Sequence, residues 1–230
     1  MEHMKQFWVD FVEGRIKVPE MLERTEAEPA LLDWLTGIAP SHCKTLVVHE
    51  VIDEDGWPSY PVEELPFDAK LQIHEYVYRK NGSTTLGKYL NIHGTFSRIM
   101  MEVFPEDEIV RDETLGDQFS FMLEACPEYI GGPEVDHLLE ELLAQLPQDL
   151  SKSKRVKLYK EQVKAMFHVQ GSKFPRWIQE AEWPLAASGK PMRFVEQKRK
   201  KGKAYTATMS TQFVFEDVDT GETKIVDQFT

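Results

Sequence analysis

The chain has 230 residues, of which 41% are hydrophobic, 11% aromatic and 29% charged. These proportions are typical of a soluble globular protein and exclude a disordered or fibrous chain. A chain of this length can bury a sizeable core without a cofactor or a disulfide, so neither is expected.

The two cysteines and the first residues of the chain bear on its compartment. Cys43 and Cys126 lie far apart and neither belongs to a C-x-x-C pair, so we expect free buried thiols and no metal. The start, MEHMKQFWVDFVEG, carries acidic residues and lacks the basic-then-apolar plan of a signal peptide. No apolar run reaches the roughly 18 residues of a membrane helix. We therefore expect a cytoplasmic protein.

Charge is distributed unevenly along the chain. The net charge is −12, but residues 1–150 hold 11 Lys and Arg against 30 Asp and Glu, whereas residues 151–230 hold 16 against 9. We expect an acidic part over residues 1–150 and a basic part over residues 151–230, as two domains or as one continuous domain. Such asymmetry bears on partners and their electrostatic steering, although mutual attraction of the two parts is the alternative.

The first half of the chain is predicted to be mainly helical. Apolar residues recur at helical spacing in four segments: Phe7–Val12, Leu31–Ile38, Thr85–Phe104 and Leu115–Leu123. The run Thr45–Ile52 is short and β-branched, which favours a strand. Asp53–Pro66 contains three prolines and is predicted to be irregular. Asp68–Arg79 fits a strand or a helix, and we favour a helix because Asp68 is placed to cap it.

The second half changes from helical to strand periodicity. Glu134–Leu146 carries one apolar face and stops at Pro147, and Ser151 or Ser153 is expected to cap a lysine-rich helix that follows. After Pro191 three strands are predicted: Met192–Lys200, Ala204–Glu216 and Glu222–Phe229. The fold class is therefore α+β, with a mainly helical N-terminal part followed by a C-terminal antiparallel β-meander.

Fragments of catalytic motifs occur, but none is complete. His49-Glu50 and His74-Glu75 begin like a zinc-hydrolase pattern, yet each lacks the second histidine four residues after the first. His42 beside Cys43 lacks a third group that would orient a nucleophile and base pair. One enzyme hypothesis stays open, because catalytic groups are defined by geometry and not by order. In it a hydrolase-like site is formed by His93, His137, His168 and nearby carboxylates.

Aromatic and basic residues gather near the C-terminus. The run Lys198–Lys203, with Trp177 and Trp183 upstream, could contact nucleic acid through phosphates and stacked bases. The sequence pI near 5.1 argues against such a partner, and a basic hairpin tip is the favoured interpretation. We expect the aromatic side chains to form one small core: Trp177, Trp183, Phe194, Phe213, Phe215 and Phe229.

Three short motifs in this region carry a family resemblance. PRWIQ at residues 175–179, EWP at residues 182–184 and GKPMRFVEQ at residues 189–197 resemble the closing module of uncharacterised bacterial proteins similar to the YwqG-like family. The resemblance continues through FVFEDVDTGE and DQF and covers about the last quarter of the chain. Several such proteins accompany secreted toxins as immunity proteins, so the resemblance implies that role. Leu185–Ser188 occupy the turn where family members often carry a cysteine pair, so no metal is expected there. Arg176, Gln179, Lys198 and Arg199 are left as secondary candidates for a partner.

The leading hypothesis is a non-enzymatic binding protein, specifically an immunity protein that neutralises a cognate protein toxin. Many toxins that attack nucleic acids are basic, and clustered carboxylates would steer such a partner quickly. The densest acidic cluster lies between two predicted helices: Glu106, Asp107, Glu108, Asp112, Glu113 and Asp117. A solvated turn is the alternative interpretation of this cluster. The sequence indicates no oligomeric state.

Overall fold

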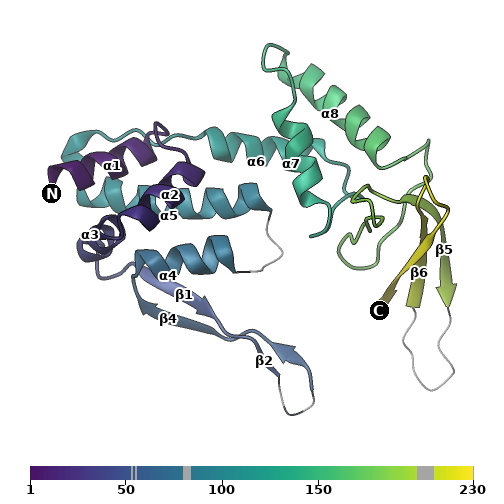
Figure 1. Ribbon diagram of the computed structural model, residues 1–230, viewed down its shortest axis with the longest axis horizontal. Coiled ribbons are helices and arrows are strands. Elements are labelled where there is room, and N and C mark those ends of the chain that lie inside the picture. Colours follow the sequence, from purple (N-terminus) through teal and green to yellow (C-terminus); the bar gives the residue numbers. More distant parts are fainter. Residues whose placement is uncertain (53, 55, 80–83, 201–209, 230) are drawn as a thin grey trace. The chain divides into compact units, whose positions relative to one another are not determined.

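The computed structural model describes residues 1–52, 54, 56–79, 84–200 and 210–229 (Figure 1). The chain divides into two compact units. Unit 1 consists of residues 1–81 and 86–117, and unit 2 consists of residues 82–85 and 118–230. The α-helices precede residue 167, and a three-stranded antiparallel sheet closes the chain. This confirms the predicted α+β class with its C-terminal meander.

Unit 1 is mainly helical, as predicted. Its α-helices are α1 (Glu2–Val12), α2 (Val18–Ala27), α3 (Ala30–Ile38), α4 (Ala69–Ile73) and α5 (Thr85–Val103). The sequence did not predict α2. Its Pro19 lies in the first turn, where backbone N–H groups have no partner within the helix, so proline costs no hydrogen bond there. Asp68 caps α4 as expected, because its carboxylate accepts a hydrogen bond from the Leu71 backbone N–H at 3.0 Å. The chain continues as a π-helical turn over His74–Tyr78.

A two-stranded ribbon leaves the helices of unit 1. Strand β1 (Lys44–Val48) pairs antiparallel with β4 (Val62–Pro66), and β2 (Val51–Ile52) pairs with β3 (Pro58–Ser59). We call residues 44–66 the hairpin arm. The expected strand near Thr45 is confirmed, but the irregular structure expected over Asp53–Pro66 is wrong for β3 and β4. Proline is tolerated there because each strand has an unpaired edge that needs no N–H donor.

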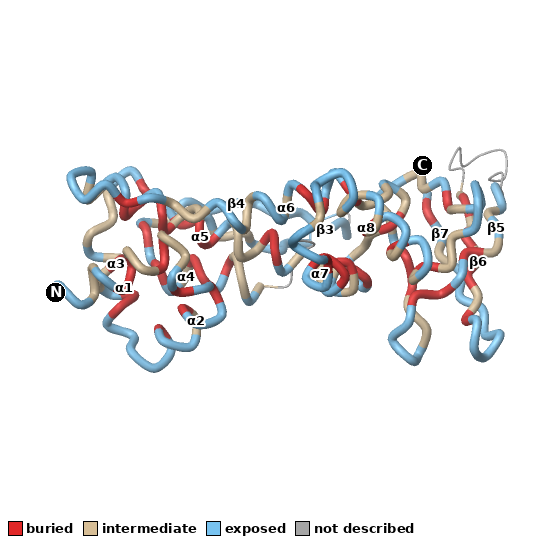
Figure 2. Tube along the Cα trace, turned by 90° about the horizontal axis from the view of Figure 1, so that it is seen from above, coloured by how far each residue is buried: buried red, intermediate tan, exposed pale blue. Residues whose placement is uncertain are grey.

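The core of unit 1 is built around buried aromatic rings. Trp8 of α1 packs edge to face against Phe96 of α5, with ring centroids 5.3 Å apart. The Trp8 indole N–H donates to the backbone oxygen of Leu31 in α3 at 3.1 Å, which satisfies its polar atom in the core. Phe67, just after the hairpin arm, contacts Phe96 at 6.3 Å. One cluster therefore joins α1, α3, α5 and the base of the arm, and Figure 2 shows these buried residues in red.

Unit 2 begins with helices and ends with the sheet. Helix α6 (Thr114–Ala125) enters it from unit 1, and α7 (Asp136–Ala144) and α8 (Lys152–Met166) follow. The helix near Ser151 starts as predicted, but the Ser151 side chain makes no capping hydrogen bond. Tyr159 of α8 is fully buried and its hydroxyl donates to the Leu139 backbone oxygen at 3.0 Å. This bond fixes α8 against α7.

The closing sheet has the order β5 (Arg193–Lys200), β6 (Ser210–Glu216), β7 (Thr223–Phe229). The expected start of the second strand at Ala204 lies outside the described residues. Alternate residues of β6, including Phe213 and Phe215, point into the core, as a half-buried strand requires. A register shift between Phe194 and Glu196 marks a bulge in β5.

The aromatic core predicted for this sheet forms with one exception. Trp183 is 1% exposed, contacts Phe167 and Phe215, and donates its indole N–H to the Met192 backbone oxygen at 2.8 Å. Trp177 packs at a tilt against Phe213, with ring centroids 4.5 Å apart, and stacks on Phe215 at 5.9 Å. Phe229 is 55% exposed, so its assignment to this core is wrong: it lies at the end of an edge strand, where nothing covers it among the described residues.

A buried glutamine ties the sheet to the segment that carries these tryptophans. The Gln228 amide oxygen accepts from the backbone N–H groups of Ile178 and Gln179, both at 3.0 Å, and its amide N–H donates to the Glu180 backbone oxygen at 2.7 Å. Gln228 is fully buried, so these bonds satisfy groups that would otherwise be costly to bury. The irregular segment at residues 178–180 is thereby hydrogen-bonded to edge strand β7.

None of the helices in the described ranges is both long and apolar enough to cross a membrane.

Replacing Trp183 tests whether the core of unit 2 depends on it. Trp183→Ala should lower the free energy of unfolding by about 3–5 kcal/mol, because it removes a buried ring and leaves a cavity. Leu123→Ala, which shortens a 65% exposed side chain of the same unit, should change it by less than about 0.5 kcal/mol. Urea denaturation followed by circular dichroism measures both. Similar losses in the two variants would contradict a structural role specific to Trp183.

Candidate functional site

The predicted acidic cluster lies on a short 3₁₀ helix, Pro105–Asp107, and the segment after it. The members differ in their surroundings. Asp107 pairs with Lys5 of α1 at 2.5 Å, and Asp112 pairs with Lys17 at 3.0 Å. Glu106, Glu108 and Asp117 are exposed to solvent, and Glu113 lies 3.7 Å from Arg111. The cluster is therefore partly a set of internal ion pairs and partly a solvated surface.

Asp112 is the best-connected member of the cluster. Its Oδ1 accepts from the Thr114 backbone N–H at 3.1 Å and from the Thr114 hydroxyl at 2.5 Å, at the start of α6. Its Oδ2 lies so close to Gly14 that a side chain at that position would collide with it. Burial opposes ionisation, but these hydrogen bonds and the Lys17 charge outweigh it and lower the pKa of Asp112 to about 2. Asp112 therefore connects α1 to α6 and is not available to a partner.

The secondary candidates near the C-terminus lie in unit 2. Arg176, Gln179, Lys198 and Arg199 are all exposed. The Lys198 ammonium lies 2.6 Å from the Glu196 carboxylate on the same strand. The Arg176 backbone N–H donates to the Gln197 side-chain oxygen at 2.9 Å. These side chains are accessible, but no described pocket contains them.

The three histidines of the enzyme hypothesis have different surroundings. His93 is buried in unit 1 with Nε2 3.2 Å from the Val12 backbone oxygen, and burial lowers its pKa, so it is a neutral core group. His137 is exposed on α7, and His168 follows α8 with φ of 53°. None of the three lines the pocket described for unit 2. His93 is therefore a core group of unit 1, and the unit 2 pocket contains neither His137 nor His168.

Unit 2 contains a half-open pocket of about 510 Å³ beside edge strand β7. Gly132 (φ 120°) permits the close approach that forms one wall, because a Cβ there would lie 2.7 Å from the Ala181 backbone oxygen. Four carboxylates line it: Glu134, Glu180, Glu182 and Asp227. Glu134 is engaged, since its Oε2 accepts from the Leu185 N–H at 3.3 Å and lies 3.5 Å from the Lys224 ammonium. An exposed acidic lining of this kind does not by itself indicate a ligand.

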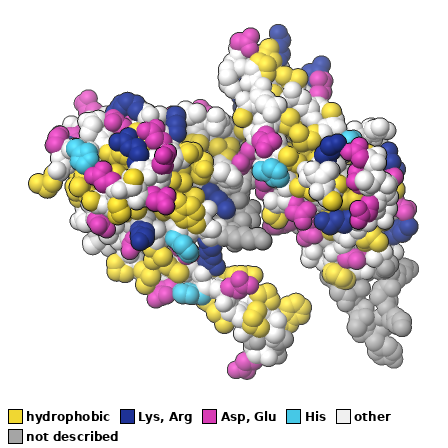
Figure 3. Space-filling model, viewed as in Figure 1, with side chains coloured by type: hydrophobic (Ala, Val, Ile, Leu, Met, Phe, Trp, Pro, Cys, Tyr) yellow, Lys and Arg dark blue, Asp and Glu magenta, His cyan; other side chains and the backbone are white. Residues whose placement is uncertain are grey.

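The hairpin arm carries the most unusual surface of the molecule. Of the fourteen large hydrophobic residues that are exposed in the described chain, six lie on it: Leu46, Val51, Ile52, Trp57, Tyr60 and Val62. Ile52 is 61% exposed, Trp57 71% and Tyr60 56%. Figure 3 shows hydrophobic side chains over the arm with Asp and Glu between them. Exposed apolar side chains gathered on one element in this way are typical of a binding site.

Strand register places two of these side chains, Leu46 and Val62, on one face. Leu46 pairs with Glu64, and Val48 pairs with Val62, so these four residues share the face opposite Thr45. Thr45 is buried, and its hydroxyl accepts from the Asp68 backbone N–H at 2.9 Å. The Val48 backbone N–H donates to the Glu75 carboxylate at 3.3 Å. The arm is therefore held at its base while its outer face stays open.

The sequence did not identify the arm as a site because the three prolines indicated a loop. One signal was nevertheless present: Trp57 and Tyr60 lie among prolines and acidic residues, without the alternation of apolar residues that would bury them. Large aromatic residues in a segment that cannot bury them are a mark of a contact surface.

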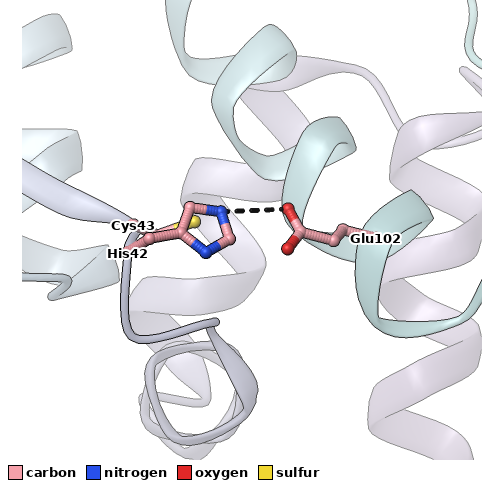
Figure 4. A group of neighbouring side chains, drawn as sticks. All are labelled: His42, Cys43 and Glu102. Carbon is pink, nitrogen blue, oxygen red and sulfur yellow. Dashed lines mark ion pairs between the residues drawn. The ribbon is translucent and has the colours of Figure 1, made fainter.

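A second grouping forms where the chain enters the arm (Figure 4). His42 and Cys43 directly precede β1, and Glu102 lies in the last turn of α5. The His42 Nε2 atom is 3.3 Å from a Glu102 carboxylate oxygen, and the ligand atoms of all three residues lie within 4.8 Å of one another. Burial raises the pKa of the Cys43 thiol, and the charge of Arg98 opposes this in part. The third group that His42 and Cys43 lacked in sequence is thus supplied by α5.

Comparison of the chain with protein-family models, with curated proteins and with solved structures found no match.

The Asp112 interactions should make stability depend on pH. The carboxylate has a folded-state pKa of about 2 against an ordinary value of 3.8, so its contribution is present above pH 4 and is lost as pH falls toward 2. Asp112→Asn should lower the free energy of unfolding by about 1–2 kcal/mol at pH 7 and by nearly nothing at pH 2. Urea denaturation at both pH values measures this, with Glu106→Gln as the exposed control. A pH-independent loss would contradict the ionic origin.

Proposed function

We propose that this chain is a protein-binding protein whose contact surface is the hairpin arm, and that its partner is a basic protein toxin that it neutralises. The observation that carries the proposal is the exposed apolar surface of the arm, from Leu46 to Val62. A folded domain gains nothing from such a surface in isolation, because exposed apolar area favours association.

The residue types on the arm favour a protein partner. Trp and Tyr are enriched among the residues that dominate protein–protein binding, because they bury large rings and keep a polar tip. Trp57 and Tyr60 provide both, and Ile52 and Val62 add aliphatic area beside them. Among the described residues β4 has β1 as its only strand neighbour, so its other edge offers backbone groups that an extended segment of a partner could pair with.

Charge favours a basic partner. Unit 1 holds 11 Lys and Arg against 23 Asp and Glu, which is −12, whereas unit 2 holds 16 against 16. The whole net charge of the chain therefore belongs to the unit that bears the arm. Glu50, Glu54 and Glu64 are exposed on the arm itself, so an apolar centre is interspersed with acidic groups. A partner with basic groups around an apolar patch would be complementary to this surface.

The immunity role is the more specific part of the proposal. It is supported by the resemblance of residues 175–197 to modules found in immunity proteins, and by the acidic charge expected of a binder of basic toxins. An immunity protein acts by covering an active site or an essential surface of its toxin, and an exposed contact element suits that role. The hairpin arm is such an element.

Substitutions on the arm test the contact surface. Ile52→Asp and Tyr60→Ala should each weaken binding to the cognate toxin by at least tenfold, because each removes exposed apolar contact area from the arm. Leu123→Asp, which alters an equally exposed residue of unit 2, should leave affinity unchanged. Biolayer interferometry gives the dissociation constants.

Two results would contradict this use of the arm. One is unchanged affinity in both arm variants, and the other is an equal loss in Leu123→Asp. Light scattering of the free protein gives a separate check, because a dimer that Ile52→Asp dissociates would assign the arm to a second copy of the chain. Absence of any binding to the toxin would overturn the immunity role.

Charge reversal tests the acidic cluster as a steering element. Glu106→Lys with Glu108→Lys should slow association several-fold at low salt, and the difference should fade at high salt because exposed charges act over a Debye length of about 8–10 Å. Asp107 is left unchanged because Lys5 holds it. Glu23→Lys with Glu26→Lys, on the exposed side of α2, is the matched control. Stopped-flow association at two salt concentrations measures the rates.

The control decides between local and distributed steering. A larger effect at Glu106 and Glu108 assigns steering to the cluster, and equal effects assign it to the charge of unit 1 as a whole. Unchanged association at low salt would remove the cluster from the encounter.

A further inference from the structure

We propose that His42, Cys43 and Glu102 bind one divalent transition metal ion of the zinc class, with a fourth position open to solvent. The three residues supply an imidazole nitrogen, a thiolate sulfur and a carboxylate oxygen, which are the donors that Zn²⁺ takes in proteins. All three belong to unit 1, so their relative positions are set within one compact body. This proposal is independent of the partner assigned to the hairpin arm.

The spacing of the donor atoms fits a tetrahedral ion. Zinc bonds of about 2.0–2.3 Å at tetrahedral angles place neighbouring ligand atoms about 3.3–3.7 Å apart. The His42 nitrogen and the Glu102 oxygen are already 3.3 Å apart, and no pair in the group exceeds 4.8 Å. Small side-chain rotations can shorten the longer of these distances to the tetrahedral spacing, since His42 and Glu102 are both exposed.

The three groups differ in burial, which leaves the site open to solvent on one side. Cys43 is buried at the end of a turn in which its backbone N–H donates to the Pro40 oxygen at 2.9 Å. His42 and Glu102 stand at the surface around it (Figure 4). The sulfur thus forms the floor of the site, the two exposed ligands form its walls, and an ion can enter from solvent. Binding would displace the thiol proton, because the thiolate is the ligand.

The geometry favours a metal over a nucleophile and base pair. In Figure 4 the His42 Nε2 atom faces Glu102 while the second ring nitrogen points away from that carboxylate. A catalytic arrangement needs the second nitrogen to receive the thiol proton, yet within the described residues no hydrogen bond joins the Cys43 thiol to His42. An exposed His and Glu pair alone would be unremarkable, as at His49 and Glu63, 2.9 Å apart. The buried thiol beside it distinguishes this group.

Cobalt titration of the full chain tests the site, with a non-thiol reductant present. Wild-type protein should bind one equivalent of Co²⁺ with a thiolate-to-cobalt charge-transfer band and the visible bands of a tetrahedral ion, and one equivalent of Zn²⁺ should displace it. His42→Asn and Glu102→Gln should each weaken Co²⁺ binding at least tenfold, and Cys43→Ala should abolish the charge-transfer band. His49→Asn and Cys126→Ser, which alter the matched pair and the other thiol, should change nothing.

The exposed variants keep the test decisive if Cys43→Ala fails to fold. His42→Asn and Glu102→Gln alter surface side chains, so circular dichroism should show wild-type structure in both. Absence of a thiolate band at one equivalent of Co²⁺ would overturn the proposal. So would an unchanged Co²⁺ affinity in both surface variants, or a band that disappears in Cys126→Ser.

Discussion

The packing around Phe96 is the constraint on which the rest of unit 1 depends. This buried ring contacts Trp8 and Phe11 of α1 and Phe67 at the base of the hairpin arm. Two hydrogen bonds reinforce the base, from Asp68 N–H to the Thr45 hydroxyl and from Ala69 N–H to the Thr36 hydroxyl. Because burial and hydrogen bonding are concentrated there, the ribbon beyond Val48 needs no core of its own. An isolated two-stranded ribbon would be marginal in water, and the anchored base is what allows this one to persist.

The composition of the arm reflects two opposing demands. Exposed apolar strands with free edges promote pairing between copies of a protein, and natural proteins restrain this with prolines and charges. Pro58, Pro61 and Pro66 remove N–H donors, and Glu50, Glu63 and Glu64 add like charges that repel a second acidic copy. The same carboxylates attract a basic protein. One set of residues therefore disfavours self-association and favours an oppositely charged partner, which is the kind of discrimination that specific binding requires.

The sequence predicted an element correctly where one periodicity of apolar residues determined it. It failed to predict groupings formed by residues that are distant in the chain. The stripes of α1, α5, α7 and α8 and the alternation in β6 were readable because burial of one face decides the element. The strands of the arm were not predicted because its prolines were taken to exclude strands, although an unpaired strand edge accommodates proline. Asp112 and Lys17 are 95 positions apart, and Glu102 lies 60 positions from His42, so neither grouping leaves a local pattern. Phe229 has the alternating spacing of a core residue of a strand, but it lies at the end of an edge strand and is exposed.

The two proposed sites are adjacent at the base of the arm. A bound ion would influence the arm, but the arm does not depend on the ion. Cys43 directly precedes β1, so an ion held by His42, Cys43 and Glu102 would restrain the chain where it enters the arm. Fewer orientations of the arm would then be lost when a partner binds, which raises affinity without any new contact. The arm does not need the ion, however, because Thr45 and Phe67 already fix its base through buried contacts. A metal at this position would therefore adjust the affinity of the contact surface, and removing it would leave that surface in place.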